Sequence, residues 1–100
     1  MVSHVPLDDR ACAEVLNMAW DYPASKQAIA EHRDCIFAVF AGHDHDGNQF
    51  YDEDNNIMFL TFKAALETRK DSSAFAVCDL YEDRIEMRGF GEIPSFVIKF

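Results

Sequence analysis

A pair of histidines directly after an apolar run is the feature that most restricts the fold of this chain. Residues 35–40 form an apolar run typical of a buried strand, and Gly42-His43-Asp44-His45 follows at once. Side chains at i and i+2 of an extended backbone point to the same side, so His43 and His45 are predicted to share one face. Imidazole is the commonest metal ligand near neutral pH, and ligands of open α/β sheets bind beyond the carboxyl ends of strands. This pattern favours a metal site here, and the alternative is a solvated loop rich in carboxylates.

Calcium loops of the EF-hand type are excluded by spacing. A loop that starts at Asp44 needs glycine at its sixth position and glutamate at its twelfth. The sequence has Gln49 and Asn55 at these positions. A loop that starts at Asp52 fits less well still.

The order of elements in the first half predicts a βαβ unit. Residues 1–4 resemble the end of a strand, residues 22–33 a helix capped by Asp21, and residues 35–40 a second strand. A right-handed crossover places the two strands in one sheet and parallel. The crossover brings His4 to the same sheet edge as His43 and His45.

Residues 8–18 are compatible with a short helix or a loop. In a helix, Val15, Leu16 and Trp20 share a face, so Trp20 is predicted to anchor the core. In the helix at residues 22–33, we expect Ala24, Ala28 and Ile29 to face the sheet.

The second half has the pattern of antiparallel strands. Turn-forming residues separate the β-rich runs, which are residues 49–51, 57–62, 74–81, 84–89 and 95–100, while residues 64–70 are expected to be extended or irregular. The predicted class is therefore α/β, becoming α+β toward the C-terminal end.

Composition narrows the classes of function. The formal charge is −9, from 9 basic and 18 acidic residues, so nucleic acid is not expected as a partner. No apolar run is long enough for a membrane span or a signal peptide. The three cysteines form no C-x-x-C pair, and free thiols in a reducing compartment predict a cytoplasmic protein.

Two short motifs resemble those of a known enzyme superfamily. Gly42-His43-Asp44-His45 resembles the Gly-His-x-His signature of the calcineurin-like metallophosphoesterases, and Ser3-His4-Val5-Pro6-Leu7 resembles the signature that precedes it. A longer pattern is similar to the manganese-dependent ADP-ribose/CDP-alcohol diphosphatase branch. It comprises Ala19-Trp20, residues 41–47, Leu66-Glu67-Thr68, residues 71–75, Tyr81-Glu82-Asp83-Arg84, and Gly89 with Gly91. The pattern covers nearly the whole chain but only the C-terminal third of such an enzyme.

The resemblance implies a fold, a cofactor and a ligand set. Residues 1–100 correspond to a partial phosphoesterase domain, the C-terminal portion of a four-layer α/β/β/α sandwich. Two divalent ions, manganese or else iron or zinc, activate a hydroxide that attacks a diphosphate such as ADP-ribose or a CDP-alcohol. His4 and His43 match ligands of one ion, His45 matches a ligand of the other, and Gly42 lets the backbone approach the ions. Asp44 and Asp46 either orient the imidazoles through hydrogen bonds, without binding an ion themselves, or are solvated side chains.

Several parts of the family site are absent from this sequence. The bridging aspartate, the Asp-x-His pair and the Gly-Asn-His element, which holds the expected general acid, have no counterpart among the 100 residues. We therefore expect the isolated chain to be inactive or weakly active, with the N-terminal part on another chain or lost. The alternatives are a non-catalytic αβ module that binds a metal or a partner at an open sheet edge, and a truncated product without function.

Two positions depart from the branch pattern. Phe62-Lys63-Ala64 stands where Leu-Glu-Gly is expected, and Gly89-Phe90-Gly91-Glu92 stands where the branch tends to carry arginines between and after its glycines. If such arginines hold an anionic substrate, these departures bear on substrate preference.

Overall fold

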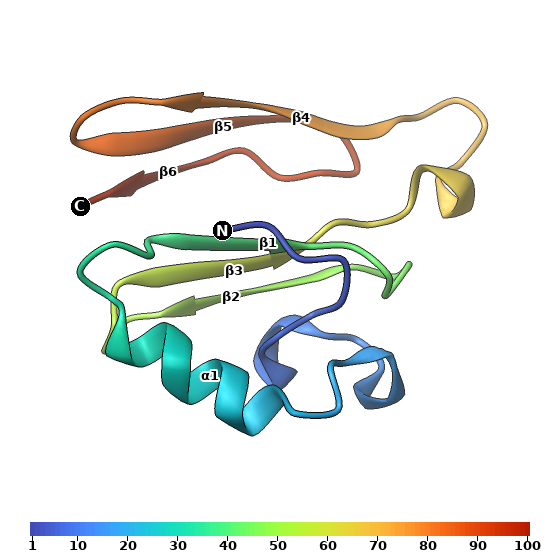
Figure 1. Ribbon diagram of the computed structural model, residues 1–100. Helices are drawn as coiled ribbons and strands as arrows, with labels where there is room; N and C mark the ends of the chain where they lie inside the picture. Colours follow the sequence, from blue (N-terminus) through green and yellow to red (C-terminus); the bar gives the residue numbers. More distant parts are fainter.

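Three layers make up the molecule: one helix, a first sheet and a second sheet, stacked in that order (Figure 1). The computed structural model describes residues 1–100. The first sheet has the strand order β1-β3-β2 and the second has the order β4-β5-β6. The predicted α/β class, with antiparallel strands after a βαβ unit, is confirmed.

The single α-helix, α1, spans Tyr22–Glu31 and covers one face of the first sheet (Figure 1). Asp21 occupies the predicted N-cap position, although its side chain makes no capping hydrogen bond. Ile29 is the buried helical residue, whereas Ala24 and Ala28 are exposed, so their predicted contact with the sheet is wrong. No helix is long and apolar enough to cross a lipid bilayer.

The first sheet consists of β1 (Ala38–Ala41), β2 (Asn48–Asp52) and β3 (Ile57–Thr61). β3 lies in the middle, parallel to β1 and antiparallel to β2. The predicted first strand of the βαβ unit is reduced to one parallel bridge, in which Val2 pairs with Phe40. The predicted direction is right, but the strand is much shorter than expected.

β3 is the centre of the core, and all five of its residues are buried. Because side chains alternate along a strand, β3 presents residues to both neighbouring layers. Ile57 and Phe59 pack in a cluster with Ile29 of α1. Met58 and Leu60 pack in two further clusters with residues of the second sheet. Strands buried on both faces read as continuous apolar runs, which is why this strand could be predicted.

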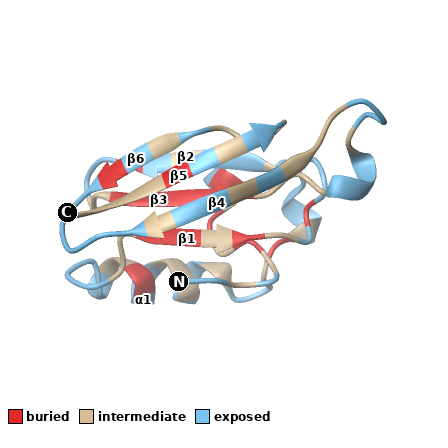
Figure 2. Cartoon of the chain, turned by 90° about the horizontal axis from the view of Figure 1, so that it is seen from above, coloured by how far each residue is buried: buried red, intermediate tan, exposed pale blue.

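The second sheet consists of β4 (Ala74–Leu80), β5 (Arg84–Gly91) and β6 (Phe96–Lys99), all antiparallel. Figure 2 shows this sheet lying over the first, with much of its upper face exposed. The predicted hairpin is present, since Tyr81 N donates to Arg84 O across the two-residue turn.

The segment between Val5 and Tyr22, for which a short helix and a loop were both compatible with the sequence, forms no α-helix. It contains two 3₁₀ turns, Asp9–Ala11 and Val15–Asn17, and Trp20 and Leu16 are exposed. The prediction that Trp20 anchors the core is therefore wrong. A third 3₁₀ turn, Ala65–Glu67, lies in the segment predicted to be irregular.

Candidate metal centre

The carboxyl end of β1 brings His4 and His43 together. The parallel bridge between Val2 and Phe40 aligns the first residues with β1. Gly42 N then donates to His4 O at 3.0 Å, which fixes the backbone of His4 beside the loop that follows β1. The predicted convergence of these two strand ends is present in the structure.

The two imidazoles are placed as adjacent ligands of one ion would be. His4 Nε2 lies 3.3 Å from His43 Nδ1, and the ring centroids are 5.1 Å apart. Two nitrogens bound to one ion at bond lengths near 2.0–2.1 Å are separated by about 3.0 to 3.4 Å. Both side chains are exposed to solvent. In the structure this contact is a hydrogen bond between the two rings, and the donor type and spacing of the pair are also compatible with a shared divalent transition-metal ion.

His45 does not join this pair. β1 ends at Ala41, and His43 has a left-handed backbone with φ of 61°, so the expected alternation of an extended strand is wrong here. The His45 ring lies beside Glu67, with 3.4 Å between Nδ1 and Oε1. No group of three or more histidine, cysteine, aspartate or glutamate side chains gathers in the chain. At this end of the sheet the chain therefore presents one histidine pair, His4 and His43, and one separate histidine, His45, a donor set smaller than metal sites ordinarily use.

The two glycines that bracket the loop differ in importance. Gly47 has φ of 67°, and a Cβ added there would lie 2.7 Å from Lys63 N. Glycine is required at this position because both the backbone conformation and the close approach exclude a side chain. At Gly42 a Cβ would meet nothing nearer than His4 O at 3.7 Å, an ordinary contact.

Asp44, between the two histidines, is buried and contacts no imidazole. Its carboxylate accepts four hydrogen bonds from the preceding loop: Ala13 N at 2.5 Å, Cys12 Sγ and Glu14 N at 3.1 Å, and Asn17 Nδ2 at 3.2 Å. The side chain is therefore neither solvated nor bonded to a ring. It joins residues 42–47, the loop that carries His43 and His45 and is called the histidine loop below, to residues 12–17.

These contacts shift the pKa values of Asp44 and of Cys12, one of its hydrogen-bond donors. Burial raises the pKa of Asp44, but hydrogen bonds from Cys12, Glu14, Asn17 and Ala13 outweigh it, and the pKa lies below its usual value. Burial, followed by the hydrogen bond to this carboxylate, raises the pKa of the Cys12 thiol to about 11. Asp44 is thus an ionised acceptor at neutral pH, and Cys12 is a neutral donor.

Asp46 lies at the exposed end of the loop, on the rim of an open groove of about 390 Å³. Lys63 and Glu92 also line this groove, and their Nζ and Oε2 atoms are 2.6 Å apart. The two departures from the branch pattern therefore meet as an ion pair. The contact between these two residues could not be predicted from the sequence, because Lys63 follows β3 of the first sheet and Glu92 follows β5 of the second.

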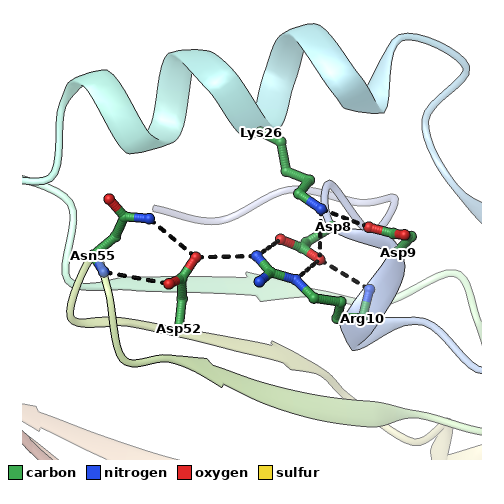
Figure 3. Close-up of polar contacts among 6 residues, drawn as sticks. All are labelled: Asp8, Asp9, Arg10, Lys26, Asp52 and Asn55. Carbon is green, nitrogen blue, oxygen red and sulfur yellow. Dashed lines mark hydrogen bonds and ion pairs between the residues drawn. The ribbon is translucent and has the colours of Figure 1, made fainter.

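A second polar cluster holds the loop that follows His4 (Figure 3). The carboxylate of Asp8, which is fully buried, accepts from Arg10 Nη2 at 2.7 Å, and the same nitrogen donates to Asp52 at 3.0 Å. Lys26 of α1 lies 2.8 Å from Asp9 and 3.7 Å from Asp8. The cluster contains no histidine. It joins the first loop, α1 and the end of β2 into one unit.

No protein-family model matches the chain, but individual relatives do. The human manganese-dependent ADP-ribose/CDP-alcohol diphosphatase is 33% identical over 101 residues, covering 100% of this chain and 28% of the relative. The protein of the same name from Danio rerio is 34% identical over 98 residues, covering 98% of this chain and 30% of the relative.

A solved structure agrees with these relatives. The crystal structure of a dimetal phosphatase from Danio rerio superposes with a TM-score of 0.90 at 33% identity, covering 98% of this chain and 30% of that one. The chain thus spans less than a third of the length of the proteins that it matches. It has the fold of part of a dimetal phosphatase and is, along its whole length, a relative of the manganese-dependent ADP-ribose/CDP-alcohol diphosphatases.

Proposed function

We propose that the chain is part of a metal-dependent diphosphatase that hydrolyses a nucleoside diphosphate-linked substrate of the ADP-ribose or CDP-alcohol type. The observation that carries the proposal is the pair of imidazole nitrogens 3.3 Å apart at the end of β1. The similarity to enzymes of this name, over the whole chain, supports the substrate class. The anionic substrate fits a chain of formal charge −9 only through bound cations, which reverse the local charge.

The residues divide into two ligand groups in this proposal. His4 and His43 hold one divalent ion, manganese by analogy with the names of the relatives, and His45 contributes to a second. Bound ions of this kind supply Lewis-acid activation of water and of the phosphoryl group. Asp44 holds the loop, and Asp46 remains solvated. No side chain here is assigned as the general acid.

Two histidine ligands at one ion and one at the other are too few to hold both ions tightly. A second polypeptide segment must therefore complete the site. The isolated chain is therefore expected to show no manganese-stimulated hydrolysis of ADP-ribose or CDP-choline. Mixing it with the segment of the Danio rerio relative that it does not match should give manganese-dependent release of the nucleoside monophosphate.

His32 provides a matched control for this experiment. It lies at the C-cap of α1, outside the histidine loop. In the reconstituted mixture, His43→Ala should reduce hydrolysis at least tenfold, while His32→Ala should leave it unchanged. Strong hydrolysis by the isolated chain, or full activity with His43→Ala, would contradict the proposal.

The metal site can also be tested without activity. Mn²⁺ added to the isolated chain should broaden the imidazole NMR resonances of His4 and His43 before that of His32, because paramagnetic broadening falls steeply with distance. Equal broadening of all histidines would mean that no specific site exists. Selective broadening without any activity in the mixture would favour the non-catalytic metal-binding module.

A further inference from the structure

Glu67 is the one acidic side chain that contacts a histidine of the proposed metal site. Its Oε1 lies 3.4 Å from His45 Nδ1. Both side chains are about half exposed, so this contact alone is weak. The backbone around it is what holds the two side chains together.

Ala64 joins the segment of Glu67 to the histidine loop. Ala64 N donates to His45 O at 3.0 Å. Its carbonyl accepts from Glu67 N and from Thr68 Oγ1, both at 3.1 Å, at the start of the 3₁₀ turn Ala65–Glu67. One residue thus fixes the backbone of His45 on one side and the turn that carries Glu67 on the other.

Glu92 holds both ends of this segment. Its Oε2 pairs with Lys63 Nζ at 2.6 Å, and its Oε1 accepts from Arg69 N at 3.4 Å. Glu92 N donates to Ser73 O at 2.8 Å. The carboxylate therefore spans residues 63 to 69, and the segment between them cannot move away from the loop without breaking these bonds.

We propose that Glu67 is a positioning residue for His45, fixing the tautomer that leaves Nε2 free to bind a metal ion. A carboxylate beside Nδ1 favours the proton on that nitrogen, and carboxylate–histidine pairs of this kind orient metal-binding imidazoles in other proteins. This inference rests on the proposed function, because it assigns a role at the same metal centre. It also explains the ion pair of Lys63 and Glu92, which holds the segment in place and is not free to bind an anion.

The tautomer of His45 can be measured in the metal-free chain. Nitrogen-15 shifts of the imidazole, recorded at about pH 9 where a free imidazole is neutral, should show the Nδ1–H form of His45 in the majority. Glu67→Ala should shift His45 toward the Nε2–H form that free imidazole prefers in water. Glu67→Gln, whose side-chain oxygen can still accept, should restore part of the Nδ1–H population. Glu53→Gln, an exposed change in the β2–β3 turn, is the control.

Metal binding gives the second readout. In the mixture with the complementary segment of the Danio rerio relative, Zn²⁺ binding followed at the His45 resonances should be about 10- to 100-fold weaker in Glu67→Ala, as is usual when such a partner is removed. Binding at His4 and His43 should be unchanged. A majority Nε2–H form in the wild type, or a tautomer ratio that Glu67→Ala does not alter, would overturn the inference. Absence of binding at His4 and His43 would instead overturn the proposed function, so the two failures are distinguishable.

Discussion

A single buried carboxylate determines how the histidine loop sits on the molecule. Asp44 lies between two exposed imidazoles, yet all four of its hydrogen bonds come from residues 12–17. Two of the donors are backbone N–H groups, Ala13 N and Glu14 N, whose satisfaction depends on this side chain. The loop therefore has one rigid point with an exposed imidazole on each side.

Removing this carboxylate should be costly. Asp44→Ala leaves two backbone donors and the amide of Asn17 without their acceptor, at about 3 kcal/mol in total when each lost partner costs about 1 kcal/mol or more. Asp46→Ala, an exposed change in the same loop, should stay within about 0.5 kcal/mol. Urea unfolding followed by circular dichroism measures both. Similar midpoints for the two variants would mean that the contacts of Asp44 contribute little.

The site could be predicted from sequence only in part: the meeting of two strand ends was predictable, but the positions of individual side chains were not. His4 and His43 were predicted to converge because the carboxyl ends of parallel strands share an edge, and the structure agrees. The placement of His43 and His45 on one face assumed an extended backbone, which the positive φ of His43 excludes. Glu67 was not predicted as a neighbour of His45, because a contact across 22 residues leaves no local pattern.

At the scale of elements, a charged cluster links three segments, the first loop, α1 and the end of β2, which also meet in one apolar cluster. Arg10 contributes to two carboxylates at once, and its guanidinium also lies over the ring of Phe50, 4.0 Å from the centroid. Burial raises the pKa of Asp8, but hydrogen bonds and charge from Arg10 outweigh it, so the pKa lies below its usual value. The pKa of Asp52 is likewise lowered, with burial opposed by hydrogen bonds from Asn55 and Arg10.

The sign of the pH dependence follows from these shifts. A carboxyl whose pKa is lower in the folded state stabilises the fold above its unfolded value, near 3.9, and this contribution is lost as the pH falls through the folded value. Arg10→Met should therefore destabilise the chain by about 2 kcal/mol at pH 7, less than for a fully buried pair because Arg10 is partly exposed. The difference should shrink below about pH 4. Urea unfolding at pH 7 and pH 3 measures it.

Arg88 supplies the control for this prediction. Its pair with Asp79 spans the exposed face of the second sheet at 2.9 Å. Arg88→Met should change the free energy of unfolding by less than about 0.5 kcal/mol at either pH. An equal effect of the two substitutions would show that the cluster around Asp8 is no more than another surface pair.

Helices and strands were predicted well where the residue pattern was compatible with only one kind of secondary structure. The apolar run of β3 and the alternation of β4 and β5 left little choice, and these strands and the β4–β5 hairpin formed where they were expected. The segment at residues 8–18 was ambiguous because its apolar spacing fits a helix. A distant carboxylate, Asp44, accepts the N–H groups of Ala13 and Glu14, which a helix would have used internally. Such tertiary competition cannot be detected in the local sequence.

At the scale of the whole molecule, the second sheet has a free edge. β4 pairs only with β5, so its other side presents unpaired backbone groups, and Leu80 there is exposed. An open edge with apolar side chains is a template for pairing with another chain. The edge suits pairing with a strand of another polypeptide, such as a second copy of the chain.

We expect the isolated chain to self-associate through this edge. Leu80→Lys should reduce the mean mass measured by light scattering at high protein concentration, because a charge on an edge strand opposes pairing. Leu16→Lys, at a leucine that is equally open to solvent but lies in a 3₁₀ turn, should have no effect. A monomer at all concentrations in the wild type would contradict this prediction.

The bridge between Val2 and Phe40 has a consequence for the order of folding. The β2–β3 hairpin closes over a few residues, whereas this bridge joins residues 38 positions apart and has no partner until β1 is in place. Longer loops cost more entropy to close, so the amino-terminal residues are expected to dock late. The two imidazoles at the sheet edge would then meet only after β1 is in place, and a chain in which the first sheet has not yet formed could not bind a metal ion through both of them.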